Sequence, residues 1–268
     1  MALLLAAALS YAGTTVVVMK HPAGGGGGGC NTSAITFWWR AEAADFSATD
    51  GTLDFSPGDN TGTATGTPTI GASAGKNGTN GVISDATGDY YLFTVSSDDL
   101  VDGSQGCIGA WAQIPSTWPQ TGREIVAIRN AGATRQLRLY FTGSSGARTA
   151  SFAVTDGGGA STTVTTGSYT NSAAWFWYVG CWDATQAAGS DAAFVEVYNS
   201  SLSLIASSYN STATIADIPS GDLTQLRVGS TNGTGAADVY HDHIIIYNTY
   251  ASASNVTTCA NQANYDNS

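Results

Sequence analysis

The amino-acid sequence predicts an all-β fold, a two-sheet antiparallel β-sandwich. Short runs rich in β-branched and aromatic residues recur along the chain between clusters of Gly, Asn, Asp and Ser, which is the pattern of strands and turns. No stretch shows the 3.6-residue apolar period of an amphipathic helix. The acidic residues are nearly all aspartates, which favour turns, whereas the helix-favouring glutamates are only Glu42, Glu124 and Glu196.

The predicted strands run from a tryptophan-rich first segment to a closing segment rich in isoleucine. In one of them, alternation places Leu137, Leu139 and Phe141 on one face. Arg138 and Tyr140 then lie on the opposite face. The predicted strands are residues 35–42, 81–84, 90–95, 106–114, 124–129, 135–141, 150–154, 162–166, 174–182, 193–199, 202–208, 225–230 and 239–248.

The chain is predicted to form one large domain behind a separate N-terminal segment. Its 268 residues suit one all-β domain, and no repeat or linker divides them after Cys30. We predict an apolar arm or signal with a glycine tether over residues 1–29 and the β-sandwich over residues 30–268. Residues 174–182 are apolar on both faces, which predicts a strand covered on each side. The polar residues 50–80 predict a loop region with one or two short strands.

The N-terminal segment is apolar and has more than one explanation. Residues 2–18 carry no charge, and the step Ser10–Ala12 resembles a signal-peptidase site, although no basic region precedes it. The run is marginal for a transmembrane helix, because TTVVV favours a strand. A cleaved signal and a retained assembly arm covered by partner subunits both stay open. Gly24 to Gly29 form a flexible tether. A lipoprotein anchor at Cys30 is the third option, although glycines replace the aliphatic residue expected before it.

The charge composition speaks against a nucleic-acid partner. The formal net charge is −11, and only nine side chains are basic. Nucleic-acid binding needs basic residues that neutralise phosphates, and the composition offers no such patch. Only 11% of residues are charged, against about 25% in an average globular protein, which is typical of secreted and virion proteins. Sequons for N-glycosylation fit an extracellular surface and begin at Asn31, Asn77, Asn199, Asn210, Asn232 and Asn255.

Enzymatic groups are not apparent in the sequence. A glycosidase needs two carboxylates on either side of the bond it cleaves. The glutamates lie in separate segments, and Glu196 has no acidic neighbour two residues away. A Ser-His-Asp triad lacks the GxSxG-like turn that would support it. We therefore predict a protein that is not an enzyme, with a polysaccharide-active hydrolase or lyase as the alternative.

Two groups of side chains have residue types that can bind a metal ion. His241 and His243 are two residues apart, so in a regular strand they share one face and could bind a metal with a third ligand. We expect instead that the two histidines lie at the surface or between the sheets and bind no metal. Calcium is the cofactor that loop carboxylates would favour, although folding requires none. Its candidate ligands, which are alternatively turn-forming residues, are Asp54, Asp59 and Asn60, or Asp98, Asp99 and Asp102.

A ligand-binding loop is predicted around Trp118, which lies between two prolines. An exposed aromatic ring beside hydrogen-bonding side chains is the arrangement that binds glycans, and Gln120 and Arg123 are close enough to add polar contacts. The alternative is that Trp118 covers an exposed edge of the sandwich. The other tryptophans lie in predicted strands and are expected in the core.

Several short motifs follow one another in order between residues 34 and 255. They are FWWR at 37–40, GKNG at 75–78, DYY at 89–91, GCIGAW at 106–111, WYVGCWD at 177–183, VEVYN at 195–199, LRVG at 226–229 and DVYHDHIIIYN at 238–248. Their order and spacing resemble the laminin G-like members of the concanavalin A-like lectin/glucanase superfamily. The resemblance implies a jelly-roll sandwich, but these are scaffold positions and imply no particular ligand. The Glu-x-Asp-x-x-Glu motif of the superfamily's glucanases is absent.

The resemblance also bears on the four cysteines. In such sandwiches the first and last strands usually pair antiparallel, which would bring Cys30 near Cys259 and imply a disulfide between them. Cys107 and Cys181 lie in predicted strands. They either form the remaining disulfide or stay as buried thiols.

Together these features predict a non-catalytic binding and display module. It would work outside the cytoplasm, on a cell surface, a phage particle or a filament, and contact glycans or a surface protein through its loops. The N-terminal arm would anchor it or assemble it with copies of itself. The alternative is a structural decoration protein that binds no ligand.

Overall fold

The structure is a computed structural model that describes residues 35–39, 46–47, 51–53, 61–71, 75–76, 81–84, 88–95, 104–114, 123–144, 146–170, 173–186, 192–210, 214–219, 222–229 and 239–250. The predicted N-terminal arm, glycine tether, Cys30 and Cys259 lie outside these residues. The strands are β1 (Ile35–Trp39), β2 (Phe46–Ser47), β3 (Gly51–Leu53), β4 (Thr61–Thr65), β5 (Thr69–Gly71), β6 (Gly81–Ser84), β7 (Tyr90–Thr94), β8 (Gln105–Gln113), β9 (Arg123–Arg129), β10 (Gln136–Ser144), β11 (Ala147–Thr155), β12 (Ser161–Thr165), β13 (Trp175–Asp183), β14 (Ala193–Tyr198), β15 (Leu204–Asn210), β16 (Gln225–Gly229) and β17 (Val239–Tyr247).

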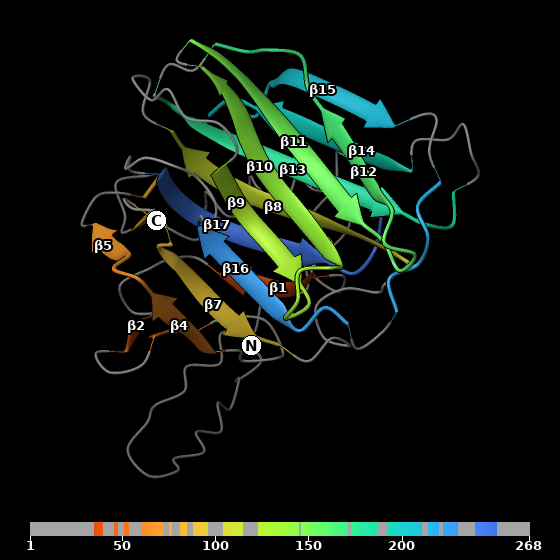
Figure 1. The fold of residues 1–268 in the computed structure, drawn as a ribbon. Coiled ribbons are helices and arrows are strands. Elements are labelled where there is room, and N and C mark those ends of the chain that lie inside the picture. Colours follow the sequence, from red (N-terminus) through yellow and green to blue (C-terminus); the bar gives the residue numbers. More distant parts are fainter. Residues whose placement is uncertain are drawn as a thin grey trace, which may run out of the picture.

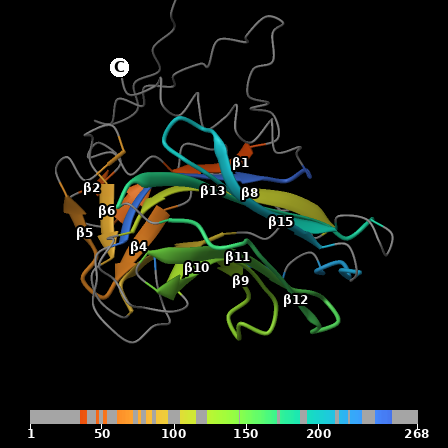
Figure 2. The same ribbon diagram turned by 90° about the horizontal axis from the view of Figure 1, so that it is seen from above.

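These strands form two antiparallel sheets that pack face to face, as Figures 1 and 2 show. The first sheet has the order β15-β14-β13-β8-β17-β6-β5, with β1 also paired to β17. The second sheet has the order β12-β11-β10-β9-β16-β7-β4-β3-β2 and faces the viewer in Figure 1. The predicted all-β, two-sheet antiparallel sandwich is therefore confirmed.

The individual strands also agree with the sequence pattern. Every predicted strand overlaps an observed one, and the first and last strands, β1 and β17, pair antiparallel. The stretch 50–80 differs, because it contributes three short strands, β3, β4 and β5, instead of one or two. Two of them pair with strands outside the stretch, β4 with β7 and β5 with β6, so their pairing partners are not visible in the stretch itself.

The core lies between the sheets, and a second apolar cluster covers the outer face of the first sheet. Leu137, Leu139 and Phe141 are fully buried between the sheets, as their alternation predicts. Strand β13 contributes to both regions. Its Tyr178 packs in the core between the sheets, whereas Trp177 belongs to the outer cluster. The prediction that this strand is covered on each side is confirmed.

A disulfide joins β8 to β13 on the outer face of the first sheet. Cys107 lies directly opposite Cys181 in the antiparallel register, and their sulfur atoms are 2.07 Å apart. Of the two alternatives for these cysteines, the structure therefore shows the disulfide and not the buried thiols.

One glycine of β8 allows a tryptophan ring to lie flat against the sheet. A Cβ atom on Gly109 would be 2.4 Å from the ring of Trp177, which is fully buried. We expect Gly109→Ala to lower the free energy of unfolding by about 1–3 kcal/mol, because the ring cannot shift without disturbing its neighbours. Chemical denaturation measures this. Gly132→Ala is the control, since the nearest atom to its Cβ is 3.8 Å away, and equal losses in the two variants would contradict the argument.

The two histidines of β17 do not share a face as a regular strand would place them. The register shifts between Asp242 and Ile244, and His243 has a φ of 45°. His241 pairs with Ala112 of the core between the sheets. His243 instead accepts a hydrogen bond of 3.4 Å at Nδ1 from Nε1 of Trp38, which belongs to the outer cluster. This bulge separates the two imidazoles, and within the described chain no group of three His, Cys, Asp or Glu side chains gathers that could hold a metal.

Candidate functional site

A cluster of arginines lies on the outer face of the second sheet. Arg129 lies in β9, Arg138 in β10 and Arg227 in β16, and β9 lies between the other two strands. Each follows or precedes a fully buried core residue, so alternation turns it away from the core. All three are half-buried. We call this cluster, together with Glu124, Tyr90 and Tyr140, the arginine face.

The strand register explains why the three arginines are neighbours. Ala127 of β9 lies opposite Arg138 on one side and opposite Arg227 on the other. Arg129 is two residues further along β9, on the same face. The three long side chains therefore border one small residue, and Ala127 is fully buried.

Two of the arginines form cation–π contacts with tyrosine rings. The guanidinium of Arg138 lies 5.0 Å from the ring centroid of Tyr140, and that of Arg227 lies 4.6 Å from the ring centroid of Tyr90. Arg227 also donates a hydrogen bond of 3.1 Å from Nη2 to Oε1 of Gln225. Cation–π contacts of this kind hold a guanidinium in place while its remaining N–H groups stay available.

The arginine face carries more positive than negative charge. Its acid, Glu124, is almost completely buried and lies with Oε1 2.6 Å from Nε of Arg138. Burial lowers the pKa of Arg129, and the charge of Arg227 lowers it further, against the opposing effects of Glu124 and Tyr90. The surplus charge makes this face attractive to an anion.

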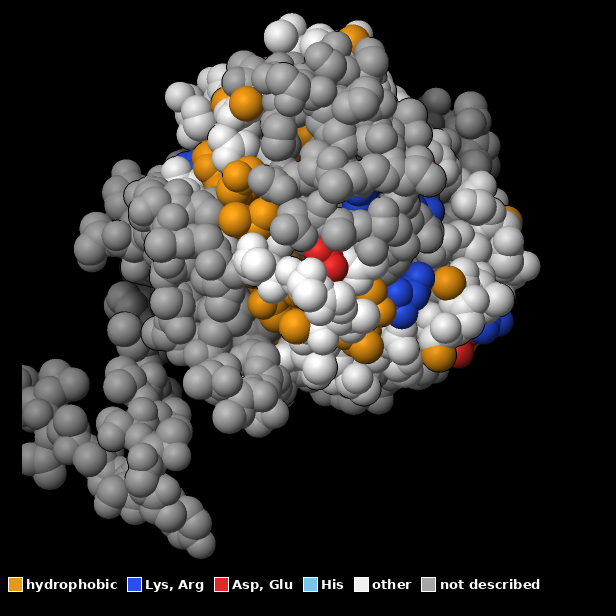
Figure 3. All heavy atoms as spheres, turned by 60° about the vertical axis from the view of Figure 1, so that its left-hand side comes forward, with side chains coloured by type: hydrophobic (Ala, Val, Ile, Leu, Met, Phe, Trp, Pro, Cys, Tyr) orange, Lys and Arg blue, Asp and Glu red, His pale blue; other side chains and the backbone are white. Residues whose placement is uncertain are grey.

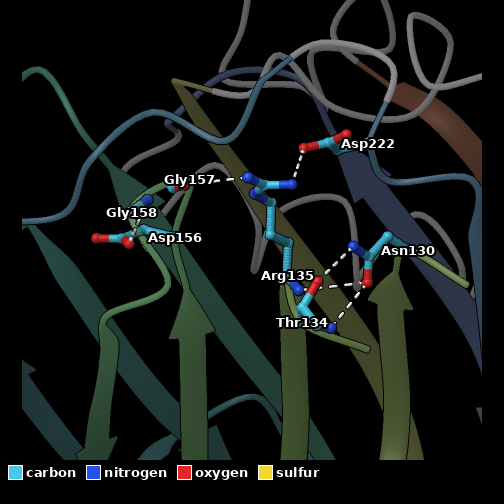
Figure 4. Close-up of polar contacts among 7 residues, drawn as sticks. All are labelled: Asn130, Thr134, Arg135, Asp156, Gly157, Gly158 and Asp222. Atoms are coloured by element: carbon cyan, nitrogen blue, oxygen red, sulfur yellow. Dashed lines mark hydrogen bonds and ion pairs between the residues drawn. The ribbon is translucent and has the colours of Figure 1, made fainter. Parts of the chain in front are cut away.

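A clamp at the end of the arginine face fixes the strands that carry it. Arg135 lies in the β9–β10 turn, and its Nη1 forms an ion pair of 2.6 Å with Oδ2 of Asp222 (Figure 4). Its Nη2 donates a hydrogen bond of 3.3 Å to the carbonyl oxygen of Gly157. In the same turn, Oδ1 of Asn130 accepts from the backbone N–H of Thr134 at 2.9 Å. The turn directly follows Arg129, and Asp222 precedes β16, so the clamp ties β9 and β16 together at this end.

The space-filling view shows where basic side chains reach the described surface. In Figure 3, Lys and Arg side chains appear as separate groups, most of them over the right-hand part of the described surface, and an Asp or Glu side chain lies near one of them.

The loop predicted to bind a ligand is described only at its last residue. Trp118 and Gln120 lie outside the described residues, so their role stays a prediction. Arg123 is fully buried, in disagreement with the exposed position that a surface ligand contact requires. Arg123 begins β9, lies opposite Phe141 and faces inward as Phe141 does. Burial lowers the pKa of Arg123, and the charge of Asp89 acts in the opposite direction. Alternation in β9, shifted by an irregularity beside Glu124, turns Arg123 inward.

The candidate calcium ligands cannot be placed. Asp54, Asp59 and Asn60 lie outside the described residues, as does the second set, and the calcium site stays a prediction. None of the described segments forms a helix with the length and hydropathy needed to cross a membrane.

The two glutamates in the described chain lie on opposite outer faces of the sandwich. Glu124 belongs to the second sheet and pairs with Arg138. Glu196 belongs to the first sheet, where its carboxylate accepts hydrogen bonds from the hydroxyls of Tyr198 and Tyr209. The whole sandwich separates the two carboxylates, so they cannot act together across one glycosidic bond.

The sequence pattern did not predict the arginine face, because the composition indicated no basic patch. Alternation does place Arg138 and Tyr140 outward, and the same pattern in β9 and β16 places Arg129 and Arg227 outward. The pairing of β9 with β16 is what gathers them, and the two strands lie far apart in the chain. Composition counts charges but does not show which strands become neighbours.

Comparisons with known proteins give a likeness in fold. No protein-family model and no curated protein sequence matches the chain. Among solved structures, the receptor-binding domain of botulinum neurotoxin C/D mosaic serotype matches with a TM-score of 0.60 and 10% identity, over 86% of this chain and 52% of that one. The serotype G binding domain matches with a TM-score of 0.57 and 11% identity, over 84% and 50%.

A third structure is the serotype D ligand-binding domain in complex with N-acetylneuraminic acid, with a TM-score of 0.56 and 12% identity, over 86% of this chain and 51% of that one. The chain thus spans about half the length of these domains. Identities this low establish the fold alone. The protein therefore has the lectin-like jelly-roll sandwich fold found in botulinum neurotoxin binding domains.

Proposed function

We propose that this protein is a non-catalytic binding module whose arginine face recognises carboxylate-bearing glycans. The observation that carries the proposal is the gathering of Arg129, Arg138 and Arg227 around Ala127 on one sheet face, where the buried Glu124 pairs with Arg138. An anionic ligand would relieve the mutual repulsion of these guanidiniums.

The chemistry of the face suits an acidic sugar. A guanidinium presents a planar fork of N–H donors that matches the two oxygens of a carboxylate. The rings of Tyr90 and Tyr140 beside the arginines add apolar surface against which a sugar ring can pack. The likeness to a domain complexed with N-acetylneuraminic acid, which is itself a carboxylated sugar, supports this ligand class, although about half of that domain lies outside the match.

We further propose a laminin G-like family, a location outside the cytoplasm and a binding role for this protein. The order of the scaffold motifs supports a place among the laminin G-like sandwiches. The low charge content and the sequons support an extracellular, cell-surface or virion location, with a surface protein as the other partner class. The opposite placement of Glu124 and Glu196 supports a role in binding and not in glycoside cleavage.

Arg129→Gln combined with Arg227→Gln tests the arginine face. We leave Arg138 unchanged, because its loss would strand the buried Glu124. With 3′-sialyllactose as the probe, we expect the double variant to bind at least about tenfold more weakly, because each charge-assisted hydrogen bond contributes roughly 1.5–3 kcal/mol. Isothermal titration calorimetry at two salt concentrations measures both the loss and the electrostatic share.

The matched control is Arg129→Lys with Arg227→Lys, which keeps both charges but removes the planar fork. We expect an intermediate affinity, and lactose, which has no carboxylate, should bind none of the proteins measurably. Equal affinity of the original protein and the glutamine variant for sialyllactose, or equal binding of lactose, would overturn the proposal. A heparin disaccharide and a glucuronic acid disaccharide, used in parallel, identify which acidic sugar is preferred.

A further inference from the structure

The first sheet ends in an edge strand that carries exposed apolar side chains. Strand β15 is the terminal strand of the sheet, and no described strand pairs with its outer side. Leu204 and Ile205 of this strand are 51% and 39% exposed, although both are large apolar residues. The sequence of the strand, LIASSYN, contains neither a charged residue nor a proline.

Edge strands of this kind usually carry a protecting feature. Lysines, prolines or inward-pointing charges normally prevent an edge from pairing with another chain. Strand β15 has one irregularity, a register shift opposite Val197 and Tyr198, which lies at its start. The neighbouring edge of the second sheet, β12, has the sequence STTVT and is also uncharged. Both edges lie on the same side of the sandwich in Figure 2. This side is therefore suited to accept a further strand.

The chain itself contains a segment with the chemistry of such a strand. Thr14 to Val18 read TTVVV, five consecutive β-branched residues without charge. Residues of this type have the highest strand preference and pack well against a half-buried sheet. An extended segment that adds to a sheet edge gains main-chain hydrogen bonds, and its alternate side chains give specificity.

The tether behind this segment is long enough for it to reach a neighbouring molecule. Residues 19–34 separate the segment from β1 and include Gly24 to Gly29. When extended they could span roughly 50 Å. Strand β1 lies beside β17, and β8, β13 and β14 separate β17 from β15, which is a distance of roughly 20 Å across the sheet. The span exceeds this distance, so the segment can reach a β15 edge in its own molecule or in a neighbouring one, and the oligomeric state distinguishes the two arrangements.

We propose that Thr14–Val18 of one copy adds as a strand to the outer edge of β15 of a second copy. The contact joins two different surfaces, the arm of one molecule and the sheet edge of the next, so it is heterologous and can continue into a row of molecules. The proposal holds whether or not a signal is removed at Ser10–Ala12, because the segment follows that step in the sequence.

Two variants of the full chain separate the donor from the acceptor. Val17→Pro removes a main-chain N–H from the arm and leaves the sandwich unchanged. Ile205→Lys places a charge on the exposed edge and leaves the arm unchanged. Gly26→Ser in the tether is the matched control. Sedimentation velocity over a range of concentrations measures association, and the melting temperature of each variant confirms that the sandwich is folded.

We expect the original chain and the Gly26→Ser variant to form concentration-dependent oligomers. Each of the other variants alone should associate at least about tenfold more weakly. A mixture of the two should form a one-to-one dimer, because the Ile205→Lys protein still donates an arm and the Val17→Pro protein still offers an edge.

Three results would overturn the inference. They are a monomeric original chain at all concentrations, association that survives Val17→Pro, and a mixture that stays monomeric although both proteins are folded. None of these measurements involves a sugar, so their outcome is independent of the glycan-binding test.

Discussion

Removing the disulfide with Cys107→Ala and Cys181→Ala is expected to lower the free energy of unfolding by about 4 kcal/mol. The bond closes a loop with a sequence separation of 74 residues and thereby restricts the unfolded chain. In the chain-entropy model, the loss grows with the logarithm of the loop length. The two cysteines are fully buried in the outer apolar cluster, so alanine leaves no polar group without a partner there.

Urea denaturation of both proteins, with and without a reductant, measures this effect. The reduced original protein should approach the stability of the double variant, whereas the variant should not respond to reductant. A loss below about 1 kcal/mol would contradict the entropic argument. The urea dependence of the unfolding free energy serves as the control, because a less restricted unfolded state exposes more surface and makes that dependence steeper.

Acid is expected to destabilise the fold strongly through His241. Complete burial lowers the pKa of this imidazole from 6.5 to about 3. Below pH 6.5 the unfolded chain binds a proton that the folded protein does not, so stability falls as the pH falls and the loss continues to about pH 3. Each pH unit in this window corresponds to about 1.4 kcal/mol, which gives a total loss of roughly 4–5 kcal/mol.

His241→Leu is expected to abolish this part of the pH dependence. Both ring nitrogens are buried without a hydrogen-bond partner in the described chain, and Val82 and Ala112 lie opposite the residue on the adjacent strands. Leucine should therefore also raise stability at pH 7 by about 1–3 kcal/mol, because no unsatisfied polar group remains. Unfolding free energies from pH 8 to pH 3.5 test this. A histidine resonance of the native protein that titrates near pH 6.5 and is lost in the variant would refute the low pKa.

Much of the fold could be predicted from local sequence pattern. Alternation in β10 correctly placed Leu137 and Phe141 inward and Arg138 outward, because the side-chain period of a strand is two. The tryptophan-rich run that became β13 was correctly predicted to be covered on both faces. These properties depend only on residues that are close in the chain.

The candidate site depended on properties that are not local. Arg129 and Arg227 are neighbours only because β9 pairs with β16. Register shifts within strands also prevented a correct assignment of side chains to faces, because such a shift reverses the face of every residue beyond it. The shift beside Glu124 turned Arg123 inward, and the bulge at His243 separated the two histidines. Neither irregularity has a glycine or proline that marks it in the sequence.

The open edge at β15 and the arginine face lie on different parts of the sandwich. The edge is at the rim of the first sheet, whereas the arginines cover the flat side of the second. Strand addition at the rim would therefore leave every arginine face uncovered and repeat it at a regular interval. Such a row would be multivalent, and a glycan-coated surface would meet many weak sites at once. Avidity can then exceed the affinity of one site by roughly 10²–10⁴ without any new contact.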